Sequence, residues 1–293
     1  MRDERLTMTT VLVTGATGKV GSRVVQELRA CGVPVRAFVR DPDRAAAVLG
    51  RGVELAVGDF AEPESVRRAL AGVERVFLTS GDSLYKVEYE TNVIDAAAGV
   101  RRLVMLSTVG AEVGSPVGLF DWHGRIERHL RGSGIPAVVL QASHLMSNVL
   151  AFRETITQAS RFFLPVGKAR IAMIDPRDVA AVAAAVLTTD GHDGKTYLLT
   201  GPEAITYHDV AERLSAAAGR TITFVDLPDE AAWQRLVQAG MPEWLADDLV
   251  ALCGLLREGL AEPTTGTVQA LTGREPRDFA EFARHHAGLF RLC

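Results

Sequence analysis

Three glycines near the start of the chain are spaced for phosphate binding. Gly15, Gly18 and Gly21 lie at intervals of three, between an apolar run and a helical pattern that begins near Ser22. Dinucleotide binding needs this order, because a tight turn and a close backbone approach must precede a helix N-terminus with free N–H groups. A plain strand-to-helix turn is the less favoured alternative. The predicted cofactor residues are Thr14, Gly15, Ala16, Thr17, Gly18, Lys19, Val20 and Gly21. We expect the Thr14 and Thr17 hydroxyls to hydrogen-bond within the turn.

The end of the second apolar run bears on which dinucleotide is bound. The run Val35–Val39 ends in Arg40, where NAD binders usually place Asp or Glu to hold the ribose 2′-OH. A guanidinium instead matches phosphate oxygens, so Arg40, with Lys19 as a second cation, predicts NADP(H) in preference to NAD(H). Two points oppose this. Asp41 would repel a phosphate, and Arg40 could be an ordinary solvated loop cation.

Strands and helices alternate over the first half of the chain. Six continuous apolar runs, typical of strands covered on both faces, lie at Thr10–Thr14, Val35–Val39, Val53–Val57, Arg75–Thr79, Leu103–Ser107 and Ala137–Gln141. Helix-period segments lie near Val20–Ala30, Arg44–Leu49, Pro63–Leu70, Tyr89–Ala98 and Gly124–Arg131. The pattern predicts an α/β fold with a doubly wound parallel sheet, which is a Rossmann fold.

The pattern changes after Gln141. We expect short strands at Thr196–Thr200 and Ile222–Val225. Further helices are expected at Val179–Leu187, Tyr207–Ala217, Glu230–Gln238, Glu243–Arg257 and Arg277–His286. Asp178 is expected to cap the first of these helices. The predicted division is an NAD(P)-binding Rossmann domain at 8–150 and a smaller C-terminal α/β lobe at 151–293, which binds substrate and is interleaved with the Rossmann core.

Composition excludes several classes of protein. The net charge of −4 gives no basic surface for nucleic acid, so no nucleic-acid partner is expected. Cys31, Cys253 and Cys293 are too few and too distant for a disulfide framework or a metal site, and no metal is predicted. No apolar stretch approaches the roughly 20 residues of a membrane span. Met8 is a candidate for the natural start, and the segment before it is too short and too acidic for a signal peptide. We therefore expect a cytoplasmic protein without a membrane partner.

Seven short motifs together resemble one known family. They are Thr14-Gly-Ala-Thr-Gly18, Val39-Arg-Asp-Pro42, Gly58-Asp59, Leu106-Ser-Thr-Val-Gly110, His123-Gly-Arg-Ile-Glu127, Ile174-Asp-Pro-Arg-Asp178 and Leu199-Thr-Gly-Pro202. This set resembles the NmrA-like branch of the atypical short-chain dehydrogenases/reductases, over nearly the whole chain. The resemblance implies a Rossmann fold that binds NAD(P). It leaves the reaction open, because the branch contains quinone reductase-like proteins, triarylmethane-dye reductase-like proteins and redox-sensing regulators without catalysis.

The resemblance implies further binding residues. Asp59 would face the adenine amino group with Phe60 beside it, although Asp59 could equally cap the next helix. The carboxyl end of the fourth strand, at Thr79, Ser80 and Gly81, should lie beside the nicotinamide ribose. The segment after the sixth strand would line the nicotinamide and the substrate. Its candidate substrate residues are His144, Met146 and Asn148.

The usual catalytic pair of short-chain dehydrogenases is absent. That pair is Tyr-x-x-x-Lys, but alignment on Glu127 places Leu119 and His123 at the two positions. The remaining candidates for catalysis are Ser107, Thr108 and His123. His123 could donate a proton, or could hold the nicotinamide ribose as a lysine otherwise would. It could also be a helix-face histidine paired with a carboxylate, Asp121 or Glu127.

Three functions remain open. The first is an NADPH-dependent reductase that transfers hydride to a small quinone-like or aromatic carbonyl acceptor, which needs little protein acid because the acceptor stabilises negative charge. The second is a non-catalytic NADP(H) redox sensor. The third is a biosynthetic tailoring enzyme that acts on a polyketide-like substrate. The expected partner is a small-molecule substrate, a redox sensor would in addition change its affinity for a partner, and the chain is expected to be a monomer or a homodimer.

Overall fold

The computed structural model describes residues 10–290, so Met8, Cys293 and the first and last residues of the predicted domains lie outside the described part. Contacts divide the chain into two compact units. Unit 1 comprises the chain up to Ser107, with Trp122–Leu140 and Val179–Tyr197. Unit 2 comprises Thr108–Asp121, Gln141–Asp178 and the chain from Leu198 onward. The predicted domain division at residue 150 stays a prediction.

A seven-stranded sheet in the order β3-β2-β1-β4-β5-β6-β8 organises the fold. Its strands are β1 (Val11–Val13), β2 (Val35–Val39), β3 (Glu54–Val57), β4 (Arg75–Leu78), β5 (Arg102–Thr108), β6 (Ala137–Ala142) and β8 (Thr196–Leu199). Strand β1 pairs in parallel with both β2 and β4, so the winding direction reverses at β1. Ligands of doubly wound sheets bind at this reversal, outside the carboxyl ends of the strands.

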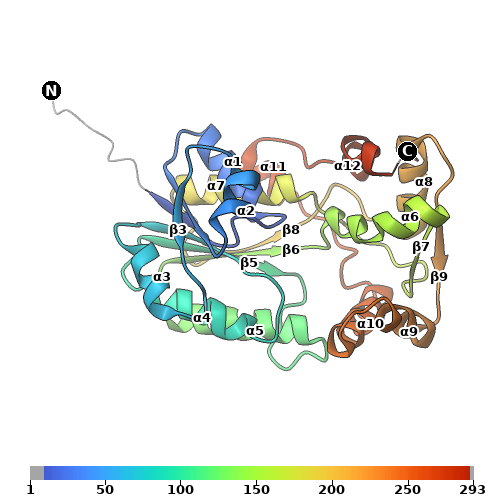
Figure 1. Ribbon diagram of the computed structural model, residues 1–293, viewed down its shortest axis with the longest axis horizontal. Helices are drawn as coiled ribbons and strands as arrows, with labels where there is room; N and C mark the ends of the chain where they lie inside the picture. Colours follow the sequence, from blue (N-terminus) through green and yellow to red (C-terminus); the bar gives the residue numbers. More distant parts are fainter. Residues whose placement is uncertain (1–9, 291–293) are drawn as a thin grey trace. The chain divides into compact units, whose positions relative to one another are not determined.

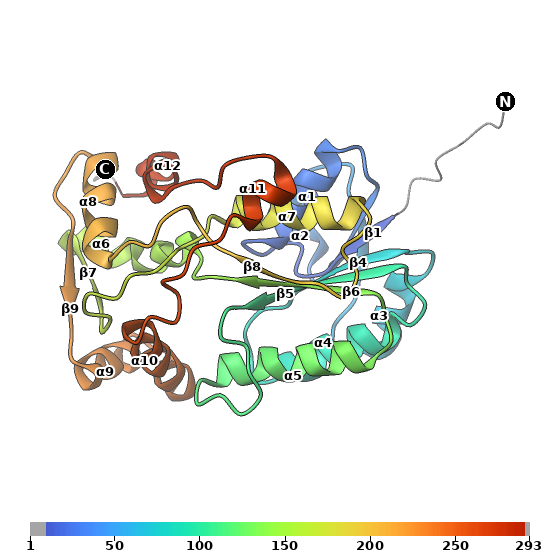
Figure 2. The same ribbon diagram turned by 180° about the vertical axis from the view of Figure 1, so that it is seen from behind.

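Helices cover both faces of the sheet. Figures 1 and 2 show α1 (Gly21–Ala30), α2 (Pro42–Leu49) and α7 (Pro176–Thr188) on one face. The other face carries α3 (Pro63–Leu70), α4 (Lys86–Ala96) and α5 (Gly118–Gly132). The predicted Rossmann fold is therefore confirmed. Strand β3 departs from the expected two-sided burial, because it is at the sheet edge and Val57 is 57% exposed.

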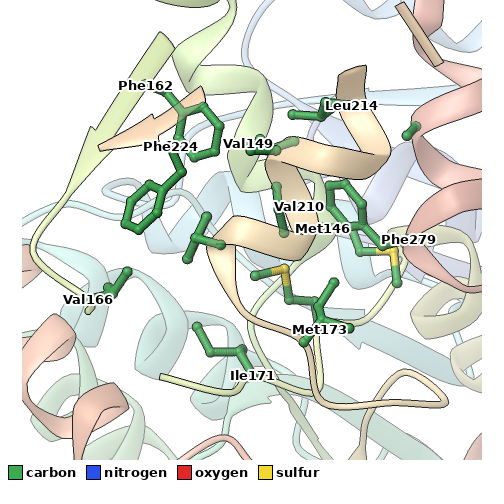
Figure 3. Packing of buried hydrophobic residues seen from close by; sticks show 14 of the residues in the cluster. Met146, Val149, Phe162, Val166, Ile171, Met173, Val210, Leu214, Phe224 and Phe279 are labelled. Carbon is green, nitrogen blue, oxygen red and sulfur yellow. The ribbon is translucent and has the colours of Figure 1, made fainter. Parts of the chain in front are cut away.

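Unit 2 has a hydrophobic core of its own. Its remaining elements are η1 (Met146–Phe152), α6 (Arg153–Ala159), β7 (Arg161–Leu164), α8 (Tyr207–Ala218), β9 (Thr223–Asp226), α9 (Asp229–Gln238), α10 (Glu243–Arg257), α11 (Thr267–Thr272), α12 (Phe279–His285) and η2 (Ala287–Leu289). Strands β7 and β9 form a parallel pair. Figure 3 shows Phe162 and Phe224, one from each strand, packed with Val210 and Leu214 of α8. Helix α8 begins with a capping box between Thr206 and Asp209.

One predicted helix cap is wrong. Helix α7 begins at Pro176, so Asp178 lies inside its first turn. Asp175 accepts a hydrogen bond from the Arg177 N–H at 2.8 Å instead, and Asp178 accepts one from the Arg277 N–H at 2.7 Å and pairs with the Arg277 guanidinium. In residues 10–290 no helix is long and apolar enough to cross a membrane.

Candidate functional site

The glycine loop between β1 and α1 leaves no room for side chains. A Cβ on Gly21 would lie 2.2 Å from the Gly15 carbonyl oxygen, and one on Gly15 would lie 2.8 Å from the Thr79 carbonyl oxygen. Gly15 also has φ +56°, in the left-handed region that glycine favours. Gly15 and Gly21 are therefore needed for the backbone path itself, whereas a Cβ on Gly18 would lie 3.1 Å from the Gly15 carbonyl oxygen.

The N-terminus of α1 has the donors that a pyrophosphate requires. Among the described residues, the backbone N–H groups of Val20 and Gly21 donate to no protein acceptor. The helix that follows adds the positive end of its dipole. Gly18 and Lys19 are exposed, whereas Ala16 and Val20 are buried beneath them. This loop fits the phosphates of a dinucleotide.

Thr14 connects two strand ends rather than closing the turn. Its side chain is fully buried, its Oγ1 lies 2.8 Å from the Thr79 carbonyl oxygen, and the Thr79 N–H donates to that Oγ1 at 2.9 Å. Thr17 makes no side-chain hydrogen bond within the described residues. The expectation of hydrogen bonds within the turn is therefore wrong. The Thr14 hydroxyl instead bonds the backbone of Thr79, just past the end of the neighbouring strand β4.

Arg40 has an exposed guanidinium at the carboxyl end of β2, with no hydrogen bond or ion pair among the described residues. Asp41 is the N-cap of α2, and its Oδ1 accepts a hydrogen bond from the Arg44 N–H at 3.0 Å. The carboxylate that would oppose phosphate binding is therefore engaged with the helix, while Arg40 is free to meet an anion.

Asp59 does not act as the N-cap of α3. Its Oδ1 accepts from the Ala61 N–H at 2.9 Å, which closes a short turn before the helix, and Glu62 occupies the N-cap position. Phe60 stacks with Tyr89 at 6.0 Å between ring centroids and meets Phe38 edge-on at 5.2 Å. An aromatic surface thus follows β3, as a slot for adenine would require.

Ser80 is held by two charged residues that the sequence analysis missed. Glu90 Oε1 accepts from the Ser80 N–H at 2.9 Å and from its hydroxyl at 2.7 Å. Lys86 Nζ donates to the same Oε1 at 3.0 Å. Both belong to α4, which begins at Lys86 rather than near Tyr89 as expected. The Lys-x-x-x-Glu spacing on one helix face, directly after a strand end, was the available signal.

His123 is a neutral imidazole. Burial and the positive charge of Lys86 hold the pKa of His123 well below its ordinary value of 6.5. Its Nδ1 is buried and has no hydrogen-bond partner among the described residues. Within the described residues His123 pairs with neither of the two expected carboxylates: Asp121 accepts from the Gly114 N–H, and Glu127 accepts from Ser107. An unprotonated ring suits orientation of a ligand better than proton donation.

Ser107 is committed to a buried carboxylate. Its hydroxyl donates to Glu127 Oε1 at 2.6 Å, and the other Glu127 oxygen accepts from Arg131 at 2.5 Å. Thr108 is partly buried and donates to the Val109 carbonyl at 3.2 Å. Ser107 is therefore fixed in orientation, with Glu127 as its acceptor.

In unit 2 one predicted substrate residue, His144, contacts a tyrosine that the sequence analysis did not select. His144 Nε2 lies 3.0 Å from the Tyr207 hydroxyl and 3.4 Å from Asn148 Nδ2. Burial raises the pKa of Tyr207, so it stays protonated. Met146 is 2% exposed and packs in the unit 2 core, as Figure 3 shows. His144 and Asn148 are only partly buried, so they are the more accessible of the three. The part of the chain that the structure describes has no group of three or more potential metal ligands.

A doubly wound sheet with a glycine loop at its switch point defines a dinucleotide-binding Rossmann protein. The chain belongs to the NmrA-like family, which it matches over residues 7–283.

Comparison with known proteins identifies reductases among its relatives. The NAD(P)H azoreductase of Xenophilus azovorans is 39% identical, over 96% of this chain and 99% of the relative. A (4-alkanoyl-5-oxo-2,5-dihydrofuran-3-yl)methyl phosphate reductase of Streptomyces griseus is 38% identical, over 96% and 99%. The crystal structure of an NADPH-dependent quinone oxidoreductase of Escherichia coli, complexed with NADPH, has a TM-score of 0.85 at 31% identity, over 94% of this chain and 99% of that one.

Proposed function

We propose that this protein is an NADPH-dependent oxidoreductase that transfers hydride to a small electron-poor acceptor, quinone-like or aromatic. The observation that carries the proposal is the glycine loop, where the free N–H groups of Val20 and Gly21 meet a backbone path that only glycine allows. The azoreductase and quinone oxidoreductase relatives support this reaction class.

The proposal assigns the parts of the cofactor and the acceptor to different predicted residues. The glycine loop binds the pyrophosphate, and Arg40 binds the 2′-phosphate of NADPH. Asp59 and Phe60 hold the adenine, whereas the Thr79–Gly81 segment and His123 orient the nicotinamide ribose. Bound NADPH supplies the hydride. His144 and Asn148 are the polar residues that contact the acceptor, and Tyr207 positions His144.

The chain's own acid groups explain the choice of acceptor. No Tyr-x-x-x-Lys pair is present, and His123 stays neutral because burial and Lys86 lower its pKa. The Ser107 hydroxyl donates its hydrogen bond to Glu127, so it is not aimed at an acceptor. A ketone would need a protein acid during reduction, whereas a quinone stabilises the incoming negative charge itself and takes its proton from solvent.

The relative from Streptomyces favours a second candidate, the biosynthetic tailoring enzyme. The substrate in its name is an acyl-substituted unsaturated lactone, which is also electron-poor. The cytoplasmic location and the monomeric or homodimeric state remain predictions.

The test is oxidation of NADPH and NADH with quinones, azo dyes, aromatic ketones and an acyl-substituted butenolide, together with calorimetric binding of both cofactors. We expect turnover of a quinone or azo dye with NADPH in preference to NADH. Turnover of the butenolide alone would favour the tailoring enzyme. Tight NADPH binding without any turnover would favour the redox sensor, and no binding would refute all three.

A further inference from the structure

A buried ion pair lies at the start of α4 in unit 1. Lys86 is 2% exposed and Glu90 is fully buried, with Nζ and Oε1 3.0 Å apart. Asp82, which is exposed, lies 3.6 Å from the same Nζ. Burial opposes charge on Lys86, yet its pKa is raised because Glu90 and Asp82 together outweigh burial. The two carboxylates therefore favour the charged form of Lys86.

The pair holds every polar group of Ser80. Glu90 accepts from the Ser80 N–H and hydroxyl, at 2.9 and 2.7 Å, and Lys86 Nζ lies 3.3 Å from the Ser80 carbonyl oxygen. Neither the strand ladder nor the helix uses these three groups. Ser80 is the second residue after the end of β4, and its orientation thus depends on two buried charged side chains.

Stability does not account for this arrangement. Removing two charges from water costs several kcal/mol per ion, and well-packed apolar side chains often serve as well or better. Lys86 also occupies the first turn of α4, where the helix dipole disfavours a cation. A lysine four residues before a glutamate is the less favourable order on a helix. The pair therefore costs more than a simple core would.

The contacts of Ser80 continue to the glycine loop. Its neighbour Thr79 is bonded twice to Thr14, and the Thr79 carbonyl oxygen defines the space beside Gly15. Two buried polar atoms, Oε2 of Glu90 itself and Nδ1 of His123, have no partner among the described residues. The pair thus controls the carboxyl end of β4, at the edge of the sheet where ligands of this fold bind.

We propose that Lys86 and Glu90 are positioning residues, which hold Ser80 and the end of β4 in the geometry that binds the nicotinamide half of the cofactor. This inference rests on the proposed function. It predicts that the pair affects the nicotinamide end of NADPH and leaves the adenine end unchanged.

Calorimetric titration of Glu90→Gln and Lys86→Met with two ligands tests the proposal. The ligands are NADPH and adenosine 2′,5′-bisphosphate, which has the adenine and the 2′-phosphate but no nicotinamide. We expect NADPH to bind about tenfold or more weakly, since charge-assisted hydrogen bonds are lost, and the bisphosphate to bind within about twofold of wild type. Glu90→Asp, which keeps the charge, should recover part of the NADPH affinity.

Asp193→Asn is the matched control. It breaks the ion pair of Asp193 with the buried Arg102 at the amino end of β5, in the same unit but at the opposite end of a strand. Both ligands should bind it as they bind wild type. Where Glu90→Gln does not fold, the double variant Lys86→Met/Glu90→Leu, which leaves no lone buried charge, replaces it.

The outcomes separate the two proposals. Failure of wild type to bind NADPH would refute the proposed function and this inference with it. If wild type binds NADPH and the variants bind both ligands normally, the positioning role is wrong and the proposed function stands. If the variants bind both ligands more weakly by the same factor, unit 1 is damaged in general, and the positioning role is likewise overturned.

Discussion

Thr14 and Thr79 hold the ends of β1 and β4 together through one hydroxyl. The Thr79 N–H donates to Thr14 Oγ1 at 2.9 Å, and this oxygen lies 2.8 Å from the Thr79 carbonyl oxygen. The two strands were adjacent in the sheet already, but their backbone ladder ends before this point. At the switch point of the sheet, a side chain therefore continues the contact between β1 and β4 beyond their backbone hydrogen bonds.

Replacing Thr14 with Val should destabilise the protein by about 1–3 kcal/mol, because a buried N–H and carbonyl lose their partner at nearly constant volume. Urea unfolding of Thr14→Val measures this loss. Thr14→Ser keeps the hydroxyl and should retain most of the stability. Equal free energies of unfolding for Thr14→Val and wild type would show that the hydrogen bond between Thr14 and Thr79 contributes nothing to stability.

Arg40→Ala should weaken NADPH binding by about 1.5–3 kcal/mol, the cost of a hydrogen bond to a charged group, and leave NADH binding nearly unchanged. Calorimetric dissociation constants for the two cofactors decide this. Arg51→Ala removes another exposed arginine from the same unit and serves as the control. Equal effects of Arg40→Ala on both cofactors would contradict a 2′-phosphate role.

Gly21→Ala should lose cofactor affinity and about 1–3 kcal/mol of stability, because its Cβ would overlap the Gly15 carbonyl oxygen. Calorimetry and urea unfolding measure the two effects. Gly132→Ala is matched, since no atom lies within 4 Å of its Cβ and its φ is not positive. A normally stable Gly21→Ala protein with full affinity would show that the loop relaxes easily.

His123 should make stability depend on pH. Its folded pKa lies below the ordinary value of 6.5, so below pH 6.5 the unfolded state takes up a proton that the folded state does not. The unfolding free energy should therefore fall on acidification, by at most about 1.4 kcal/mol per pH unit from this group. His123→Asn should remove that part of the slope. His192 and His286, whose pKa values are also lowered, contribute equally to both proteins. Identical slopes would mean that His123 titrates normally.

Tyr207→Phe should raise the KM for the acceptor about fivefold, because His144 loses a hydrogen bond worth about 1 kcal/mol. The dissociation constant of NADPH should not change. Tyr197→Phe breaks a similar pair, with His192 Nδ1 at 2.8 Å in unit 1, and should leave both constants unaltered. An unchanged KM in Tyr207→Phe would remove His144 from the acceptor site.

Most elements of the fold were predictable because their apolar runs are long or bounded by clear signals. Strand β2 and helices α3 and α10 have the predicted bounds. Strand β7 and helix α6 were not expected, because each is short and the turn between them is made by Ser160 at φ +54°, where glycine is the usual signal. Asp178 was misassigned as a cap because Pro176, which favours the first helical position, was not used to start α7.

Candidate site residues could be predicted where a local sequence motif sets the backbone conformation. They could not be predicted where side chains distant in the sequence form hydrogen bonds. The glycine loop and the free Arg40 follow from local sequence. The partners Ser107 and Glu127, His144 and Tyr207, and Thr14 and Thr79 are far apart in the chain and meet only in the fold. Lys86 and Glu90 are close in sequence, but their burial, which gives them meaning, is not visible in a pair that would ordinarily face solvent.

Strand β8 completes the sheet of unit 1 only late in synthesis. It adds the last strand to the seven-stranded sheet, yet the ribosome makes it only after β6, η1, α6 and β7, the last three of which belong to unit 2. When residue 150 has just been synthesised, the nascent chain still lacks both α7 and β8. Unit 1 therefore cannot be completed before synthesis of unit 2 has begun, so folding of unit 1 during translation must wait until Tyr197 has been made.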